Sequence, residues 1–115
     1  MTVLVVDDHA GFRACARRFL EGDGCRVVGE ASDGASAVTC ARDLCPDVAL
    51  VDVHLPDCNG FDVATRMAAL ERPPVVVLTS SHDRSEVDPL VPRSAARGFV
   101  PKEQLSRQAI EELLP

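Results

Sequence analysis

The chain has 115 residues, a mass of 12.3 kDa and a hydrophobic content of 46%, which fits one domain. A chain of this mass buries enough surface on folding to form a core without disulfides or a structural metal. Its 12 Lys and Arg residues are outnumbered by 18 Asp and Glu residues, so the net charge is −6. Because nucleic-acid binding depends on neutralising phosphates, this acidic balance argues against direct contact with DNA or RNA.

The cysteines and the first apolar residues indicate the compartment. The 5 cysteines are an odd number, form no CxxC pair and lack a histidine at zinc-finger spacing, so we expect free thiols in a reducing environment. The apolar run at residues 3–6 ends at Asp7 and is too short for a signal peptide or a membrane span. The sequence therefore predicts a cytoplasmic protein with no membrane partner.

Short apolar runs rich in β-branched residues predict strands buried on both faces, as in a parallel sheet. Continuous runs lie at residues 3–6, 48–51 and 75–78, and weaker runs lie at residues 26–28 and 98–100. These runs alternate with helical stretches, which predicts right-handed crossovers and a doubly wound α/β fold with helices on both faces of the sheet.

Apolar residues with helical spacing separate the strands. The first stripe stops at Gly22 and consists of Phe12, Cys15, Ala16, Phe19 and Leu20. Further stripes predict helices within residues 38–44, 61–70 and 105–114, with Ser106 as the N-cap of the last one.

The segment of residues 82–96 is less regular. Val87, Leu90 and Val91 have helical spacing, but Pro89 and Pro92 lie among them. A proline inside a helix costs about 3 kcal/mol, so we expect a fourth helix that is short or irregular.

Polar residues follow four of the predicted strands. They are Asp7, Asp8, Asp52, Thr79 and Lys102. Because ligands of a doubly wound sheet bind beyond the carboxyl ends of the strands, we expect these side chains to meet at one edge. Neighbouring carboxylates raise one another's pKa values unless a cation lies among them. Mg²⁺ prefers one or two carboxylates with waters and a phosphoryl oxygen, so the pattern predicts a site for Mg²⁺ and phosphate.

Four motifs stand at these strand ends, in a specific order along the chain. They are Val-Leu-Val-Val-Asp-Asp-His at residues 3–9, Asp-Val-His-Leu-Pro at 52–56 with Gly60 after it, Thr-Ser at 79–80, and Gly-Phe-Val-Pro-Lys at 98–102. Together they resemble the receiver domain of bacterial two-component response regulators, over essentially the whole chain. The resemblance implies one receiver domain over residues 1–115, with a flavodoxin-like (βα)5 fold and the strand order 2-1-3-4-5.

The resemblance also implies a magnesium site. Asp8 and Asp52 are expected to ligate Mg²⁺ directly, and Asp7 through a water molecule. The backbone carbonyl of His54 would complete the ligands from the protein.

The resemblance implies that Asp52 is phosphorylated by a histidine kinase or a phosphotransfer protein. Lys102 would pair with the carboxylate or the phosphoryl group, and Thr79 would donate a hydrogen bond to a phosphoryl oxygen. Phe99 would occupy the aromatic switch position, so that Thr79 and Phe99 together transmit the change to the face of the last strand and helix.

These roles describe a phosphoacceptor signalling module that promotes only its own phosphotransfer and dephosphorylation and is not a turnover enzyme. It would control a downstream protein or a covalently linked output domain. The Asp-Asp-His start resembles the subgroup that often carries a C-terminal helix-turn-helix domain, which points to transcription regulation. Whether the domain stands alone, and whether it forms a homodimer, are left open by the sequence.

Three alternatives compete with this interpretation. One is a phosphate-independent pseudo-receiver that binds a partner protein, although such domains would lose an acid or the lysine. Another is a haloacid-dehalogenase-like phosphatase, which has a second Asp two positions after the nucleophile, where this chain has His54. A third is a transition-metal site that includes His9 and His54, but hard oxygen ligands dominate here.

Some of the residues also have simpler interpretations. Acids such as Asp7 and Asp8 are common at a helix N-terminus. Phe99 also fits a core aromatic that anchors a short strand. Glu103 stands where many family members have a proline, and Pro101 precedes the lysine, so the loop into the last helix is expected to differ.

Overall fold

The computed structural model describes residues 1–80 and 94–114. Within them, five parallel strands form one sheet in the order β2-β1-β3-β4-β5, which confirms the expected flavodoxin-like topology. The strands are β1 (Thr2–Val6), β2 (Arg26–Ala31), β3 (Val48–Asp52), β4 (Val75–Ser80) and β5 (Gly98–Pro101). Each of them contains one of the five predicted apolar runs.

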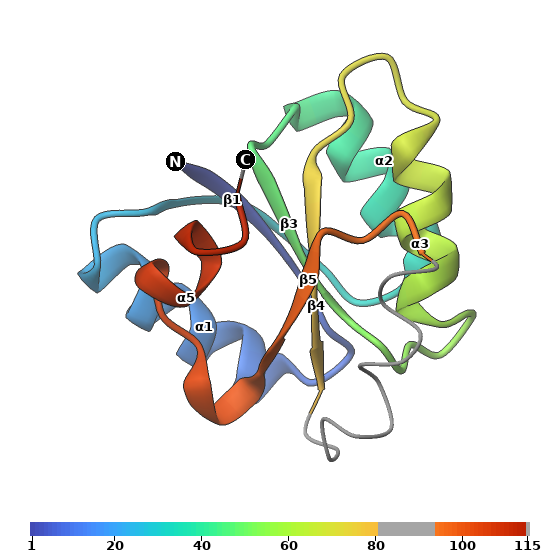
Figure 1. Ribbon diagram of the computed structural model, residues 1–115. Coiled ribbons are helices and arrows are strands. Elements are labelled where there is room, and N and C mark those ends of the chain that lie inside the picture. The colour runs from blue at the N-terminus through green and yellow to red at the C-terminus, as the bar shows by residue number, and fades with distance from the viewer. Residues whose placement is uncertain (81–93, 115) are drawn as a thin grey trace.

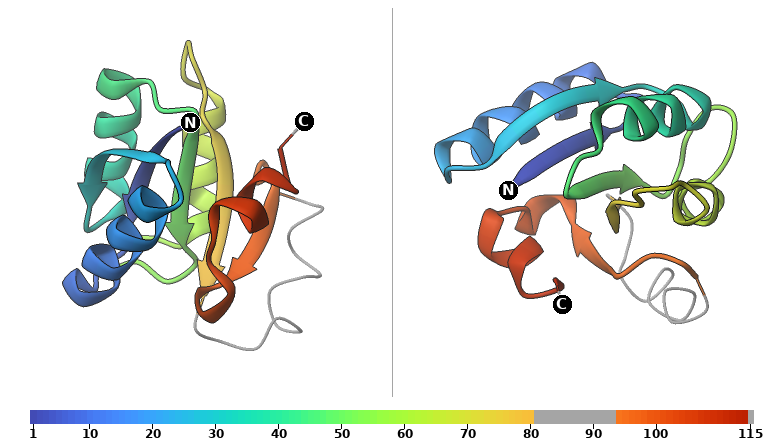
Figure 2. Two further views of the ribbon diagram at one scale, coloured as in Figure 1. Left: turned by 90° about the vertical axis from the view of Figure 1, so that its left-hand side faces the viewer. Right: turned by 90° about the horizontal axis from the view of Figure 1, so that it is seen from above.

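Helices cover both faces of the sheet (Figure 1). On one face lie α1 (Ala10–Gly22) and α5 (Arg107–Glu111), and on the other lie α2 (Gly34–Leu44) and α3 (Gly60–Ala68). Figure 2 shows the sheet from above, between these two layers. Val3 and Val5 belong to the core cluster with α1 and α5, whereas Leu4 belongs to the cluster with α2 and α3. Successive side chains of a strand point to opposite faces, so a strand covered on both sides is apolar throughout.

The helix ends follow local hydrogen-bonding rules. Ser106 is the N-cap of α5, because its Oγ accepts a hydrogen bond from the Ala109 N–H at 3.0 Å. α5 is shorter than the predicted stripe, since residues Lys102–Gln104 form a 3₁₀ turn before it. Gly24, after the end of α1, has a φ of 89°, a conformation that favours glycine.

The apolar stripe of α1 does not face the core in full. Phe19 is 64% exposed and Cys15 is also exposed, although both have the helical spacing of the stripe. Arg13 and Arg17, on the opposite flank of the helix, both bind Glu30 of β2, at 3.2 and 3.0 Å. These ion pairs accompany a helix orientation that leaves the flank with Phe19 in solvent.

Most of the predicted fourth helix lies outside the described residues. Within the described parts of the chain, no helix is long and apolar enough to cross a membrane.

Candidate functional site

The carboxyl ends of the strands bring the predicted site residues to one edge of the sheet. Asp52, the last residue of β3, lies beside Thr79 of β4 in the parallel register. Asp7 follows β1, the other neighbour of β3, and its N–H donates to the Ala31 carbonyl at 3.0 Å. Lys102 follows β5 and reaches both carboxylates.

An acidic cluster occupies this edge. Asp7 is fully buried, Asp52 is 4% exposed, and Asp8 is exposed. One ligand atom from each of Asp7, Asp8, His9 and Asp52 can be chosen so that all lie within 4.8 Å of one another. The N–H of His9 donates to Asp7 Oδ1 at 2.8 Å, and the N–H of His54 donates to Asp52 Oδ1 at 3.2 Å. Each buried acid is therefore held by the backbone two residues later, as in an Asx-turn.

The Lys102 ammonium provides the positive charge of the cluster. Its Nζ lies 2.7 Å from Asp7 Oδ2 and 3.3 Å from Asp52 Oδ2, and its side chain is 15% exposed. Asp7 Oδ2 accepts no well-aligned hydrogen bond from the described residues, so its charge is balanced by the proximity of this ammonium. Lys102 is therefore not a solvated surface lysine.

The environment moves the pKa values of the two buried acids in opposite directions. Burial raises the pKa of Asp52, and the charge of Asp7 adds to this effect, against the opposing influence of His54 and Lys102. Burial also acts to raise the pKa of Asp7, but Lys102 and the His9 N–H outweigh it and lower the pKa. Burial opposes the charged form of Lys102 too, yet the two carboxylates raise its pKa. The cluster thus favours an ionised Asp7 and a charged lysine beside Asp52.

Thr79 contributes an unsatisfied hydroxyl. Its side chain is fully buried, and Oγ1 has no hydrogen-bond partner among the described residues. Buried hydroxyls are nearly always hydrogen-bonded, so an orphan in a native fold calls for an explanation. Because Thr79 pairs with Asp52 in the sheet, a ligand or modification at Asp52 could supply the missing acceptor.

These observations agree with a comparison to protein families. The chain matches the response regulator receiver domain family over residues 3–114. It belongs to this family. The receiver domain is therefore a signalling domain of the phosphoacceptor class, and domains of this class work with histidine kinases and output domains.

Known relatives support the assignment. A putative transcriptional regulator of Pseudomonas aeruginosa is 36% identical over 112 residues, which cover 97% of this chain and 52% of that protein. The probable transcriptional regulatory protein NarL of Mycobacterium tuberculosis is 36% identical over 113 residues, with the same coverages. The solved receiver domain of that NarL has a TM-score of 0.86 at 34% identity and covers 97% of this chain and 94% of its own. The receiver domain thus spans about half the length of the curated relatives.

The residues of the acidic cluster fit a magnesium ion. Asp7, Asp8 and Asp52 offer carboxylate oxygens, the hard donors that Mg²⁺ prefers. The His9 Nδ1 lies 3.1 Å from Asp7 Oδ1 and 3.0 Å from Asp8 Oδ1. His9 thus joins the cluster as a partner of the acids, whereas His54 contributes no side-chain atom to the group of potential metal ligands found among the described residues.

The loop after β3 is tied down by its own backbone. The Gly60 N–H donates to the Val53 carbonyl at 2.8 Å, and the Leu55 N–H donates to the Cys58 carbonyl at 3.1 Å. A Cβ on Gly60 would lie 2.6 Å from the Asp52 carbonyl oxygen, so glycine permits this close approach. His54, whose carbonyl is an expected ligand, lies within this fixed loop.

Phe99 is 4% exposed and packs in the core cluster under α2 and α3. The structure therefore places it as a core aromatic that anchors the short strand β5.

Two residues near the site carry no recognisable sequence signal. The guanidinium of Arg13 donates a hydrogen bond to the Asp7 carbonyl and so fixes the turn after β1. Asp57 accepts hydrogen bonds from the N–H groups of Gly34 and Ala35, at 2.8 and 3.0 Å, and so joins the loop after β3 to the start of α2. The interactions of Asp57 join positions far apart in the sequence, which only the fold brings together.

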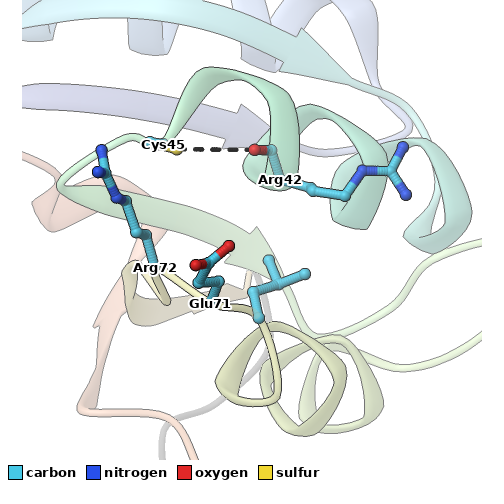
Figure 3. Close-up of a pocket in the computed structure, with 5 residues that line it drawn as sticks. Arg42, Cys45, Glu71 and Arg72 are labelled. Atoms are coloured by element: carbon cyan, nitrogen blue, oxygen red, sulfur yellow. Dashed lines mark hydrogen bonds between the residues drawn. The ribbon is translucent and has the colours of Figure 1, made fainter.

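A separate pocket of about 280 Å³ lies between the end of α2 and the connection from α3 to β4 (Figure 3). Its lining residues are Arg42, Cys45, Leu70, Glu71 and Arg72. They precede β3 and β4 in the chain, at the amino ends of these strands, so the pocket lies at the edge of the sheet opposite Asp52. It includes none of the predicted site residues.

Proposed function

We propose that Asp52 accepts a phosphoryl group from a histidine kinase or a phosphotransfer protein in a Mg²⁺-dependent reaction. The observation that carries this proposal is the position of Asp52, a buried acid that lies 3.3 Å from the Lys102 ammonium and is paired in the sheet with Thr79, whose hydroxyl has no partner among the described residues. A carboxylate oxygen of Asp52 forms a bond to phosphorus while the P–N bond to the donor's imidazole breaks. The departing imidazole nitrogen then takes up a proton.

The remaining residues have defined tasks in this proposal. Asp8 and Asp52 would hold Mg²⁺ directly, Asp7 through a water molecule, and His54 through its backbone carbonyl. The bound ion supplies positive charge where negative charge develops during phosphoryl transfer. Lys102 already lies beside Asp52 and contributes a second positive charge at the same place.

Thr79 and Phe99 would convert phosphorylation into a structural change. The Thr79 hydroxyl donates a hydrogen bond to a phosphoryl oxygen, which satisfies the orphan group and draws the end of β4 toward Asp52. Phe99 and the face formed by β5 and α5 then shift between two states whose populations the phosphoryl group sets. The domain promotes only its own phosphotransfer and dephosphorylation.

The output that we propose is transcription regulation in the cytoplasm. Two relatives are named as transcriptional regulators and are about twice as long as the aligned region. The receiver domain would act on a downstream protein or a linked output domain. It would not bind nucleic acid itself, because its net charge is −6.

Intact-mass measurement tests the proposal, and it suits a chain that has neither Trp nor Tyr for fluorescence. The protein is incubated with acetyl phosphate, with Mg²⁺ or with a chelator, beside Asp52→Asn and the control Asp43→Asn, which changes an exposed acid on α2. We expect the mass of one phosphoryl group on the wild type and on Asp43→Asn, in Mg²⁺ only. Equal labelling of Asp52→Asn would contradict the site, and no labelling of any sample, with acetyl phosphate or a cognate kinase, would favour a phosphate-independent pseudo-receiver.

A further inference from the structure

The Lys102 ammonium has a neighbour besides the carboxylates. Its Nζ lies 4.4 Å from the centroid of the Phe12 ring, over the face of the ring. This distance is within the range of a cation–π interaction, in which the negative face of an aromatic ring attracts a cation. Phe12 is half-buried on α1, and it packs against the core cluster with α5.

A lysine in this position needs positioning. Its flexible four-carbon stem allows many rotamers, and its ammonium carries three N–H donors. Asp7 and Asp52 lie on one side of the ammonium, at 2.7 and 3.3 Å, and the Phe12 ring covers another side. With its side chain only 15% exposed, Lys102 has little contact with water that could replace these partners.

The backbone links the ring to the acids. α1 begins at Ala10, directly after Asp8 and the N-cap His9, so Phe12 lies in its first turn. The turn that places Asp7 beside the Lys102 ammonium therefore also places the Phe12 ring against the ammonium. An aliphatic residue of similar size would fill the space but would offer no negative face.

We propose that Phe12 is a positioning residue for Lys102, whose ring holds the ammonium beside Asp52 for phosphoryl transfer. This inference rests on the proposed phosphorylation of Asp52 and adds a residue on α1 to that reaction. Phe12 does not touch the reacting atoms, and it acts through the lysine.

Fluorine substitution on the ring separates an electrostatic role from a packing role. Phenylalanines with one, two and three ring fluorines, introduced at position 12 alone, weaken the negative face with little change in size. We expect the rate of phosphorylation by acetyl phosphate in Mg²⁺ to fall stepwise, by about two- to fivefold for the most fluorinated ring. The same series at Phe19, which is 64% exposed on the same helix, should leave the rate unchanged.

Nuclear magnetic resonance of the lysine side chain gives a measurement independent of phosphorylation. The methylene protons next to the Lys102 ammonium should show a ring-current shift that disappears in Phe12→Leu. Thermal unfolding of this variant is measured alongside, to check that it remains folded. A rate that is flat across the fluorinated series, in a protein that is phosphorylated, would overturn the role of Phe12 alone. A wild-type protein that takes up no phosphoryl group would overturn the proposed function, and the role of Phe12 in it.

Discussion

Replacing Gly60 with alanine would press a methyl group against the backbone of β3 at the phosphorylation site. The new Cβ would lie 2.6 Å from the Asp52 carbonyl oxygen and 3.0 Å from the Val53 Cα, whereas ordinary contacts begin at 3.4 Å. Backbone atoms cannot rotate away as a side chain can, so the loop and the start of α3 must separate by most of an ångström. Overpacking of this kind costs about 1–3 kcal/mol, and we expect the free energy of unfolding to fall by about 2 kcal/mol.

Urea unfolding followed by far-ultraviolet circular dichroism measures this loss. Gly11→Ala is the matched control, because its Cβ would meet nothing within 4 Å, and alanine in a helix is favoured over glycine by roughly 0.5–1 kcal/mol. The displacement should also slow phosphorylation of Asp52 by up to about a hundredfold, since small misplacements of reacting groups are costly. An unfolding midpoint and slope for Gly60→Ala equal to those of the wild type would refute this reasoning.

Two further substitutions test the neighbourhood of the site. The hydrogen bond from the Gly34 N–H lowers the pKa of Asp57 in the folded protein below its ordinary value of 3.8. The ionised carboxylate therefore stabilises the fold at pH values above 3.8, and this stabilisation is lost as the pH falls through the pKa of the folded state. The difference in the free energy of unfolding between wild type and Asp57→Asn, measured in urea titrations, should therefore shrink at acidic pH. A difference that stays constant with pH would contradict a stabilising role for the ionised Asp57. Thr79→Val replaces the orphan hydroxyl by a methyl group, so the unphosphorylated protein should gain about 1 kcal/mol while phosphorylation stays within a few fold. Hydrogen exchange at β5 should then no longer respond to phosphorylation, and a full response would count against the role of Thr79.

The sheet and its edge could be predicted because their signals are local. The run at residues 48–51 is apolar throughout because helices cover both faces of β3, and it ends at the acid that follows. Once the strands are known to be parallel, Asp52 and Thr79 must emerge at the same edge. Strand order came from the resemblance of the motifs, since apolar runs do not encode which strands are neighbours.

Other features depend on contacts between distant parts of the chain. Phe19 belongs to the apolar stripe of α1 but is exposed, and the ion pairs of Arg13 and Arg17 with Glu30 accompany this orientation of the helix. The ring of Phe12 has helical spacing typical of core residues, and its spacing gives no sign of the lysine 90 positions later that it contacts. Such pairs become visible only when the fold brings them together.

The most direct test of the proposed function is to locate the phosphoryl group chemically. An aspartyl phosphate is an acyl phosphate, which borohydride reduces to an alcohol, so phosphorylated Asp52 would become homoserine. The protein is treated with acetyl phosphate and Mg²⁺, reduced, digested and sequenced by tandem mass spectrometry. We predict homoserine at position 52 alone and none after chelation of Mg²⁺, whereas homoserine at another acid, or at no position in a phosphorylated protein, would contradict the account.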